Sequence, residues 1–185
     1  RKHAENFYCL AKESELELKG PNRKPWLGKM EMENNNIRSS LQWCFGSGQV
    51  ELGLKLAGVL EPFWYAQGSI REARDWYKLA IKAGGDRPSA FLARVICEAG
   101  SFAGVQGEYK QGRRLLERSL SMSREIADAR EIAHTLIGIG VNAAEWTDYK
   151  HQTAFLEESI SLYEELGDRR GVYEAHQRLA MLARS

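Results

Sequence analysis

Apolar residues recur at helical spacing along almost the whole chain. In 70–83 they fall on one face of a helix, at Ile70, Ala73, Trp76, Tyr77, Ala80 and Ile81. The same spacing predicts helices over 3–19, 37–44, 50–65, 70–83, 89–106, 108–126, 130–146, 149–166 and 169–184, with a short apolar stripe at 26–30. No run alternates apolar and polar residues as a strand would, so the sequence predicts an all-α fold.

Helix-breaking residues lie between these stretches. Asn34, Asn35 and Asn36 are predicted to form a turn or N-cap cluster, because Asn side chains compete for backbone hydrogen bonds. Pro62 is expected to kink the 50–65 helix or end it early, since proline has no backbone N–H to donate.

The stretch 100–130 repeats itself 40 residues later. The two segments share 11 identities in 31 aligned pairs, where composition alone would give about two. Gly100 aligns with Gly140, and Leu116 aligns with Leu156. A weaker copy precedes them, so a helical period of about 40 predicts an α-solenoid of antiparallel helix pairs.

This period divides the chain into one leading segment and four repeats. We expect N-terminal helices over 1–48, repeats over 49–87, 88–127 and 128–167, and a partial repeat over 168–185. The last helix, 169–184, fits either a capping helix or the boundary of a fragment. Because the first residues lack an initiator Met and an apolar signal core, we expect a piece of a longer protein.

The repeats resemble the tetratricopeptide repeat (TPR). The resemblance is carried by the small residue in each first helix (Gly100, Gly140) and by the turns Gly107-Glu108-Tyr109 and Thr147-Asp148-Tyr149. It implies a right-handed α-α superhelix, a TPR-like solenoid with first helices lining the concave surface. The period exceeds the roughly 34 residues typical of that repeat, and the extra residues fall in the Asp-x-Arg connections.

A narrower resemblance covers most of the chain. The segment 33–43, E-N-N-N-I-R-S-S-L-Q-W, is similar to the E-x-D-N-L-R-A-A-L-x-W stretch that follows the ATPase module in some bacterial regulators. The segment 156–168, L-E-E-S-I-S-L-Y-E-E-L-G-D, matches the ends of their repeats. These regulators are multidomain signal-transduction ATPases, including LuxR-type (MalT-like) transcription regulators.

Charge and composition narrow the function classes. The formal net charge is +1, from 26 basic and 25 acidic residues, and pairs such as Arg113-Arg114 have acids nearby. We therefore expect no direct nucleic-acid binding. No apolar run is long enough to span a bilayer, and three widely spaced cysteines suggest a reducing compartment, so we expect a cytoplasmic protein without a membrane segment.

No motif points to catalysis. Gly84-Gly85-Asp86 lacks the lysine of a phosphate-binding loop, and the four histidines have no partner at metal-ligand spacing. Cys97 and His134 could lie on neighbouring first helices, but a buried thiol filling a helix contact is the favoured interpretation. We expect no enzyme activity, no cofactor and no metal.

The resemblance to TPR superhelices places a set of side chains in the groove. They are Tyr65, Arg94, Ser101, His134, Val141, Glu145, Glu174 and Gln177. Among the aromatic residues at 63–65 and 76–77, we expect Phe63, Trp76 and Tyr77 in the core. Trp64 and Tyr65 could instead open onto the groove.

We expect a non-enzymatic interaction or sensor module. It would hold a protein or peptide partner, a neighbouring domain of its own chain, or a small-molecule inducer. The alternative is a structural spacer or oligomerisation scaffold, in which the stripe Val172, Leu179 and Ala180 of the last helix pairs with another copy. Substituting Tyr65, Arg94 or His134 is predicted to weaken binding without unfolding, whereas Gly100→Leu or Leu116→Asp is predicted to unfold the repeats.

Overall fold

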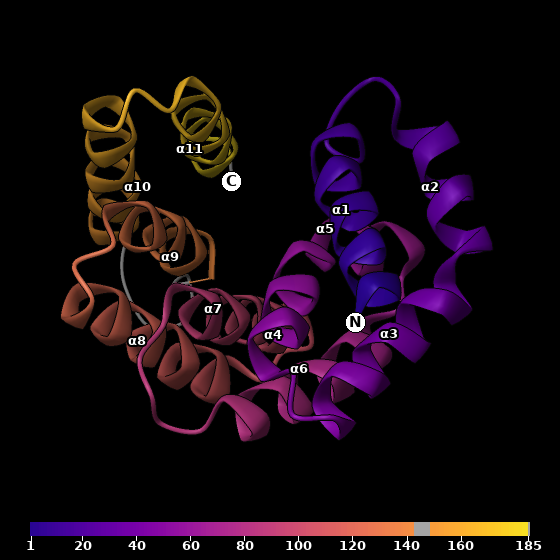
Figure 1. Cartoon of the computed structure of the whole chain (residues 1–185). Coiled ribbons are helices and arrows are strands. Elements are labelled where there is room, and N and C mark those ends of the chain that lie inside the picture. Colours follow the sequence, from indigo (N-terminus) through magenta and orange to yellow (C-terminus); the bar gives the residue numbers. More distant parts are fainter. Residues whose placement is uncertain (143–148, 185) are drawn as a thin grey trace. The chain divides into compact units, whose positions relative to one another are not determined.

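The computed structural model describes residues 1–142 and 149–184. Within these ranges the chain forms eleven helices and no strand, which confirms the all-α prediction (Figure 1). It divides into two compact units, Arg1–Arg87 (unit 1) and Pro88–Ser185 (unit 2). None of the described helices has the length and apolar character needed to cross a bilayer. The predicted division at residue 48 stays a prediction.

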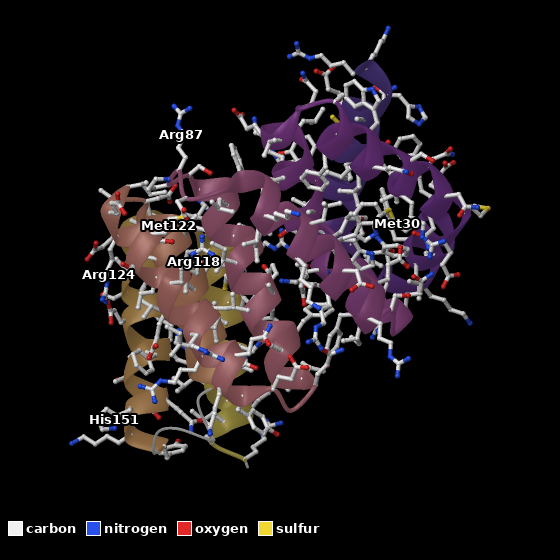
Figure 2. All side chains as sticks on the ribbon, turned by 90° about the horizontal axis from the view of Figure 1, so that it is seen from below. Met30, Arg87, Arg118, Met122, Arg124 and His151 are labelled. Carbon is white, nitrogen blue, oxygen red and sulfur yellow. The ribbon has the colours of Figure 1, made fainter. Side chains whose placement is uncertain are left out.

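Unit 1 packs its helices around α1. The helices are α1 (Lys2–Glu17), α2 (Arg23–Met32), α3 (Asn34–Gly46), α4 (Val50–Val59), α5 (Glu61–Gln67) and α6 (Ile70–Gly84). Helix α1 contacts α2 to α5, and α4 contacts both α3 and α6. Met30 of α2, labelled in Figure 2, is fully buried. The core also contains Trp64 and Tyr77, whose rings meet edge to face at 5.2 Å between centroids.

One expectation for unit 1 was wrong in detail, and the expected early end of the 50–65 helix at Pro62 was confirmed. Asn34, Asn35 and Asn36 form neither a turn nor an N-cap, because α3 begins at Asn34 and its N-cap is Glu33. The predicted 50–65 helix is two helices, α4 and α5, separated at Leu60. Pro62 occupies the first turn of α5, where its missing N–H costs no helical hydrogen bond. The proline therefore ends one helix and starts the next.

The aromatic residues of unit 1 sort differently from the expectation. Phe63 and Tyr77 are buried as predicted, but Trp64 is also buried, at 1% exposure, and does not open onto a surface. Trp76 is only partly buried, and its indole N–H donates to Glu72 at 3.3 Å. Tyr65 is exposed. Of the two aromatic side chains considered for a groove, only Tyr65 is available to solvent.

Unit 2 is built from helices that alternate between two layers. They are α7 (Ala90–Val105), α8 (Tyr109–Glu125), α9 (Ala129–Asn142), α10 (Tyr149–Glu165) and α11 (Arg169–Leu182). Their described ends lie within two residues of the predicted ranges, although the predicted end of the 130–146 helix lies outside the described residues. Helix α9 contacts all four others, and α7, α9 and α11 form one layer while α8 and α10 form the other (Figure 1).

The 40-residue repeat reappears as repeated contacts. Ser119 of α8 donates its hydroxyl to the carbonyl of Ala93 at 2.8 Å, and Ser159 of α10 donates to the carbonyl of Ala133 at 2.8 Å. Both members of the second bond lie 40 residues after those of the first. The hydroxyls of α8 and α10 therefore fix each second helix to its first helix in the same register.

Glycines allow the helices of each pair to approach closely. A Cβ at Gly100 would lie 2.9 Å from Leu116 Cγ, and one at Gly140 would lie 2.8 Å from Leu156 Cγ. Both distances are shorter than real Cβ contacts, so only glycine fits without displacement of a buried leucine. Gln152 stands where α8 has Gly112; the residue is buried, and its carbonyl oxygen would lie 3.3 Å from a Cβ at Gly140, so the close approach of the two helices is kept.

The turn between α8 and α9 contains a strained alanine. Ala127 has φ 52°, in the left-handed region, where the equivalent turn before α11 uses Gly167 at 64° and the turn between α7 and α8 uses Gly107 at 79°. We expect Ala127→Gly to stabilise the protein by about 1 kcal/mol, because glycine adopts this conformation without a Cβ clash. Chemical denaturation measures the change. Gly167→Ala is the matched reverse substitution and should destabilise the protein by a similar amount. A change of the same sign in both variants would contradict the argument.

Arginine side chains on α8 pair with acidic side chains on α8 itself and on α10. Figure 2 shows Arg118 and Arg124 along α8, with His151 on α10. Arg124 lies 3.6 Å from Glu158 of α10, and Arg113 pairs with Glu117 at 2.7 Å. The nearby acids expected from the sequence therefore lie within reach of these arginines.

Candidate functional site

The candidate site is the side of α7, α9 and α11 that faces away from α8 and α10. We call it the first-helix face. Positions 94, 98, 101 and 105 of α7 follow helical spacing along one stripe, about a third of a turn around the helix from Ala93 and Gly100, which contact α8. The face consists of Arg94, Glu98, Ser101, Val105, Glu131, His134, Val141, Glu174 and Met181.

Small residues bring α7 and α9 close together beneath this face. A Cβ at Gly138 would lie 3.1 Å from Cys97 Sγ and 3.4 Å from Ser101 Oγ. Further along, a Cβ at Gly104 would overlap the amide of Asn142. This proximity allows charged side chains on the two helices to meet directly.

The first cross-helix pair joins Arg94 to Glu131. The guanidinium donates from Nε at 2.8 Å and from a terminal nitrogen at 2.9 Å, one bond to each carboxylate oxygen. The side chains are 20% and 11% exposed. A bidentate, largely desolvated pair of this kind has defined geometry and does not depend on pH near neutrality.

The second pair lies one helical turn further along both helices. His134 Nε2 is 2.7 Å from Glu98 Oε1, and the side chains are 16% and 7% exposed. The two first helices are thus joined by two polar contacts, one with a permanent cation and one with an imidazole. Leaving a carboxylate buried at either position without its partner would be strongly destabilising.

Tyr163 extends this polar cluster into the second layer. It lies on α10 and is almost fully buried. Burial raises the pKa of the Tyr163 hydroxyl well above its usual range, and Arg94, Glu174, Glu131 and Asp168 are all close enough to influence it. The hydroxyl therefore stays neutral near pH 7.

Cys97 belongs to the core. It packs with Leu116 and Ile139, and burial, with Glu98 as the next contribution, raises the pKa of its thiol. A protonated thiol without solvent access is a poor nucleophile. The favoured interpretation of Cys97 as a helix contact agrees with this placement. In the described residues, no group of three or more His, Cys, Asp or Glu side chains is arranged to hold a metal ion.

The far half of the first-helix face is apolar. Val105 is 57% exposed, Val141 is 47% exposed and Met181 is 61% exposed. Val141 and Met181 occupy the same repeat position, held by Ser101 in α7. Apolar side chains therefore gather at the C-terminal ends of the first helices, and the paired charges gather at their N-terminal ends.

The predicted groove residues divide into three groups. Arg94, Ser101, His134, Val141 and Glu174 lie on the first-helix face. Gln177 is exposed on α11, three residues after Glu174 and four before Met181, and donates to the Tyr173 hydroxyl at 2.8 Å. Tyr65 belongs to unit 1. Glu145 lies outside the described residues.

Four residues of the face were missed by the sequence interpretation. Glu98 and Val105 lie one helical turn before and after Ser101, and Met181 lies 40 residues after Val141. Helical spacing and the repeat would have found these three. Glu131 carried no such signal, because its side chain reaches the face through its bond to Arg94.

Comparisons with known proteins give a fold likeness only. No protein-family model matches the chain, and no curated protein matches it in sequence. Among solved structures, the crystal structure of BtubC (BKLC) from P. vanneervenii matches with a TM-score of 0.57 and 12% sequence identity. The match covers 98% of this chain and 90% of that chain. At this identity the likeness concerns the helical fold and carries no function.

Proposed function

We propose that this chain is a non-enzymatic interaction module whose first-helix face binds a segment of a protein partner. The observation that carries the proposal is the row of exposed apolar side chains, Val105, Val141 and Met181, on α7, α9 and α11. Glycine contacts and ion pairs join α7 to α9, and α11 packs against α9. Exposed apolar groups on a preorganised surface are what a partner's anchor residues need.

We further propose that the helices wind into a right-handed, TPR-like superhelix and that the module belongs to a bacterial signalling ATPase or LuxR-type regulator. The repeated Ser119 and Ser159 hydrogen bonds and the Gly100 and Gly140 contacts support the repeat class. A partner would switch the parent protein by binding one of its conformations more tightly than the other.

The charged half of the first-helix face indicates which kind of partner segment is expected. Both donors of Arg94 in the pair are directed at Glu131, and Glu98 is engaged by His134. This arrangement differs from a set of cations that clamp a peptide carboxylate. The partner segment is therefore expected to bind through apolar side chains rather than through an acidic terminus.

Selection of peptides tests the proposed surface. A displayed library of random peptides about twelve residues long should yield binders that carry two or more large apolar side chains. We expect Val141→Asp with Met181→Asp to weaken the best binder at least roughly tenfold, which corresponds to about 1.4 kcal/mol. Fluorescence anisotropy of the labelled peptide measures the affinity.

The matched control is Ala154→Asp, which adds a carboxylate to the exposed side of α10. It should leave the affinity unchanged. Equal binding by the double variant and this control would refute the first-helix face as the binding surface.

Self-association is the second candidate function. Two residues of the stripe expected to pair with another copy, Val172 and Leu179, instead pack against the core of unit 2. Ala180 is exposed, as are Tyr173 and Met181 on the same helix, so α11 still presents apolar surface. Light scattering over a range of protein concentrations separates this candidate from the first, because only self-association raises the mass with concentration.

A further inference from the structure

The Arg94–Glu131 and His134–Glu98 contacts between α7 and α9 differ in whether the cationic side chain can titrate near neutral pH. Arg94 keeps its charge at every physiological pH. His134 makes the equivalent contact with Glu98 through an imidazole, which changes charge between about pH 5 and 8. The same pair of helices thus carries a permanent ion pair and a titratable one, a single turn apart.

The groups around His134 come from every helix packed against α9. Helix α7 contributes Arg94, Cys97 and Glu98, and α9 itself contributes Glu131. Tyr163 comes from α10 and interacts with Glu174 of α11 and with Asp168, which precedes α11. In the sequence, Arg178 follows Glu174 by one helical turn. On the α8 side the neighbouring group is the Ser119 hydroxyl, which lies 3.0 Å from Thr135 Oγ1 and does not titrate.

Most of these groups keep one charge state near neutral pH. Burial raises the pKa values of the Cys97 thiol and the Tyr163 hydroxyl, so both stay protonated. The arginines stay charged. Carboxylates ordinarily titrate below pH 5. The imidazole is therefore the group in this cluster whose protonation is expected to change between pH 5 and 8.

We propose that protonation of His134 tightens the α7–α9 interface, so that the first-helix face is held firmly at mildly acidic pH and loosened at alkaline pH. Glu98 is 7% exposed, and a buried carboxylate needs a compensating positive charge. Imidazolium supplies that charge through a hydrogen bond of 2.7 Å, whereas neutral imidazole supplies only a neutral donor. Burial of the imidazole opposes charging, but the carboxylate at hydrogen-bond distance dominates.

The direction of the effect follows from proton linkage. In the unfolded chain an imidazole titrates near pH 6.5. Because the folded state favours the protonated form, the stabilisation is complete below that pH and is lost as the pH rises through the titration of the folded state. The inference concerns the interface alone and requires no ligand.

Hydrogen exchange of the whole chain tests the proposed pH response of the α7–α9 interface. Exchange is measured by mass spectrometry at about pH 5.5 and pH 8.5 and corrected for the intrinsic exchange rate at each pH. Amides of α7 and α9 should lose protection at the higher pH, and the thermal midpoint of unit 2 should fall by roughly 5 °C. In His134→Gln both differences should vanish. His176→Gln, which removes an exposed histidine of α11, should keep the wild-type response.

Two outcomes would overturn the inference. One is equal protection of α7 and α9 in the unchanged chain at both pH values, a readout that does not depend on any variant folding. The other is a full pH response in His134→Gln, which would assign the effect to another group. Glu98→Gln is an additional discriminator, because it removes the carboxylate and should abolish or reverse the response.

Discussion

Replacing Leu116 with aspartate is expected to unfold unit 2. Leu116 is fully buried in α8 and packs against both α7 and α9, with its Cγ 2.9 Å from where a Cβ at Gly100 would lie and its Cδ2 3.0 Å from one at Gly138. The substitution removes a core side chain and places a carboxylate in a site without solvent access. The combined cost is about 4 kcal/mol or more, a large part of the 5–15 kcal/mol that stabilises an ordinary domain.

Urea denaturation followed by circular dichroism measures this loss, and hydrogen exchange over 90–182 assigns it to unit 2. The control is Ser121→Asp, which introduces the same charge at an exposed position of the same helix and should change stability by less than about 0.5 kcal/mol. A variant at Leu116 that melts cooperatively within about 2 °C of the unchanged chain would show that this leucine is not the core contact described here.

The helix pairs of unit 2 could be predicted from the sequence because the apolar spacing and the 40-residue repeat indicated the same helices. Apolar spacing located the helices, and the 40-residue shift placed Gly100 with Gly140 and Leu116 with Leu156. The structure brings each glycine against its own leucine. In unit 1 the signal was weaker: the residue equivalent to these glycines is Glu61, where one expected helix is two.

The polar contacts of the candidate site could not be predicted in this way. The repeat shift aligns equivalent positions, so it matches Arg94 with His134. In the structure Arg94 bonds Glu131 instead, and His134 bonds Glu98. Helices α7 and α9 are therefore offset by about one helical turn, with a close approach at Gly138, and no shift of the sequence against itself reveals this offset.

This geometry changes the expected result of the variants first considered for the groove. Removing Arg94 takes the bidentate partner from the buried Glu131, and removing His134 takes the imidazole contact from the buried Glu98. Either change is expected to weaken the α7–α9 interface as well as any binding. Val141 and Met181, which are exposed, are the cleaner positions for testing recognition.

At the start of α11, a small residue packs against a large one, whereas the preceding repeat has the large residue on the first helix and the small one on the second. Gly171 lies against the ring of Tyr163, and a Cβ there would approach three ring atoms to within 2.5 Å. In the preceding repeat the equivalent positions hold Glu131 and Ser123, a large residue opposite a small one. We expect Gly171→Ala to destabilise unit 2 by about 2–3 kcal/mol, because the buried ring must move to accept the new methyl group.

A double-mutant cycle with Tyr163→Ser separates this steric conflict from any intrinsic effect of alanine. With the ring removed, Gly171→Ala should become neutral or slightly stabilising, since alanine has a higher helix propensity than glycine. The backbone N–H of residue 171, which donates to Asp168 Oδ1 at 3.0 Å in the unchanged chain, is kept in the alanine variant. Urea denaturation of the four proteins gives the coupling free energy. The same cost of Gly171→Ala in both backgrounds would mean that Tyr163 does not pack on Gly171, and that α11 meets α10 in a different register from the one described.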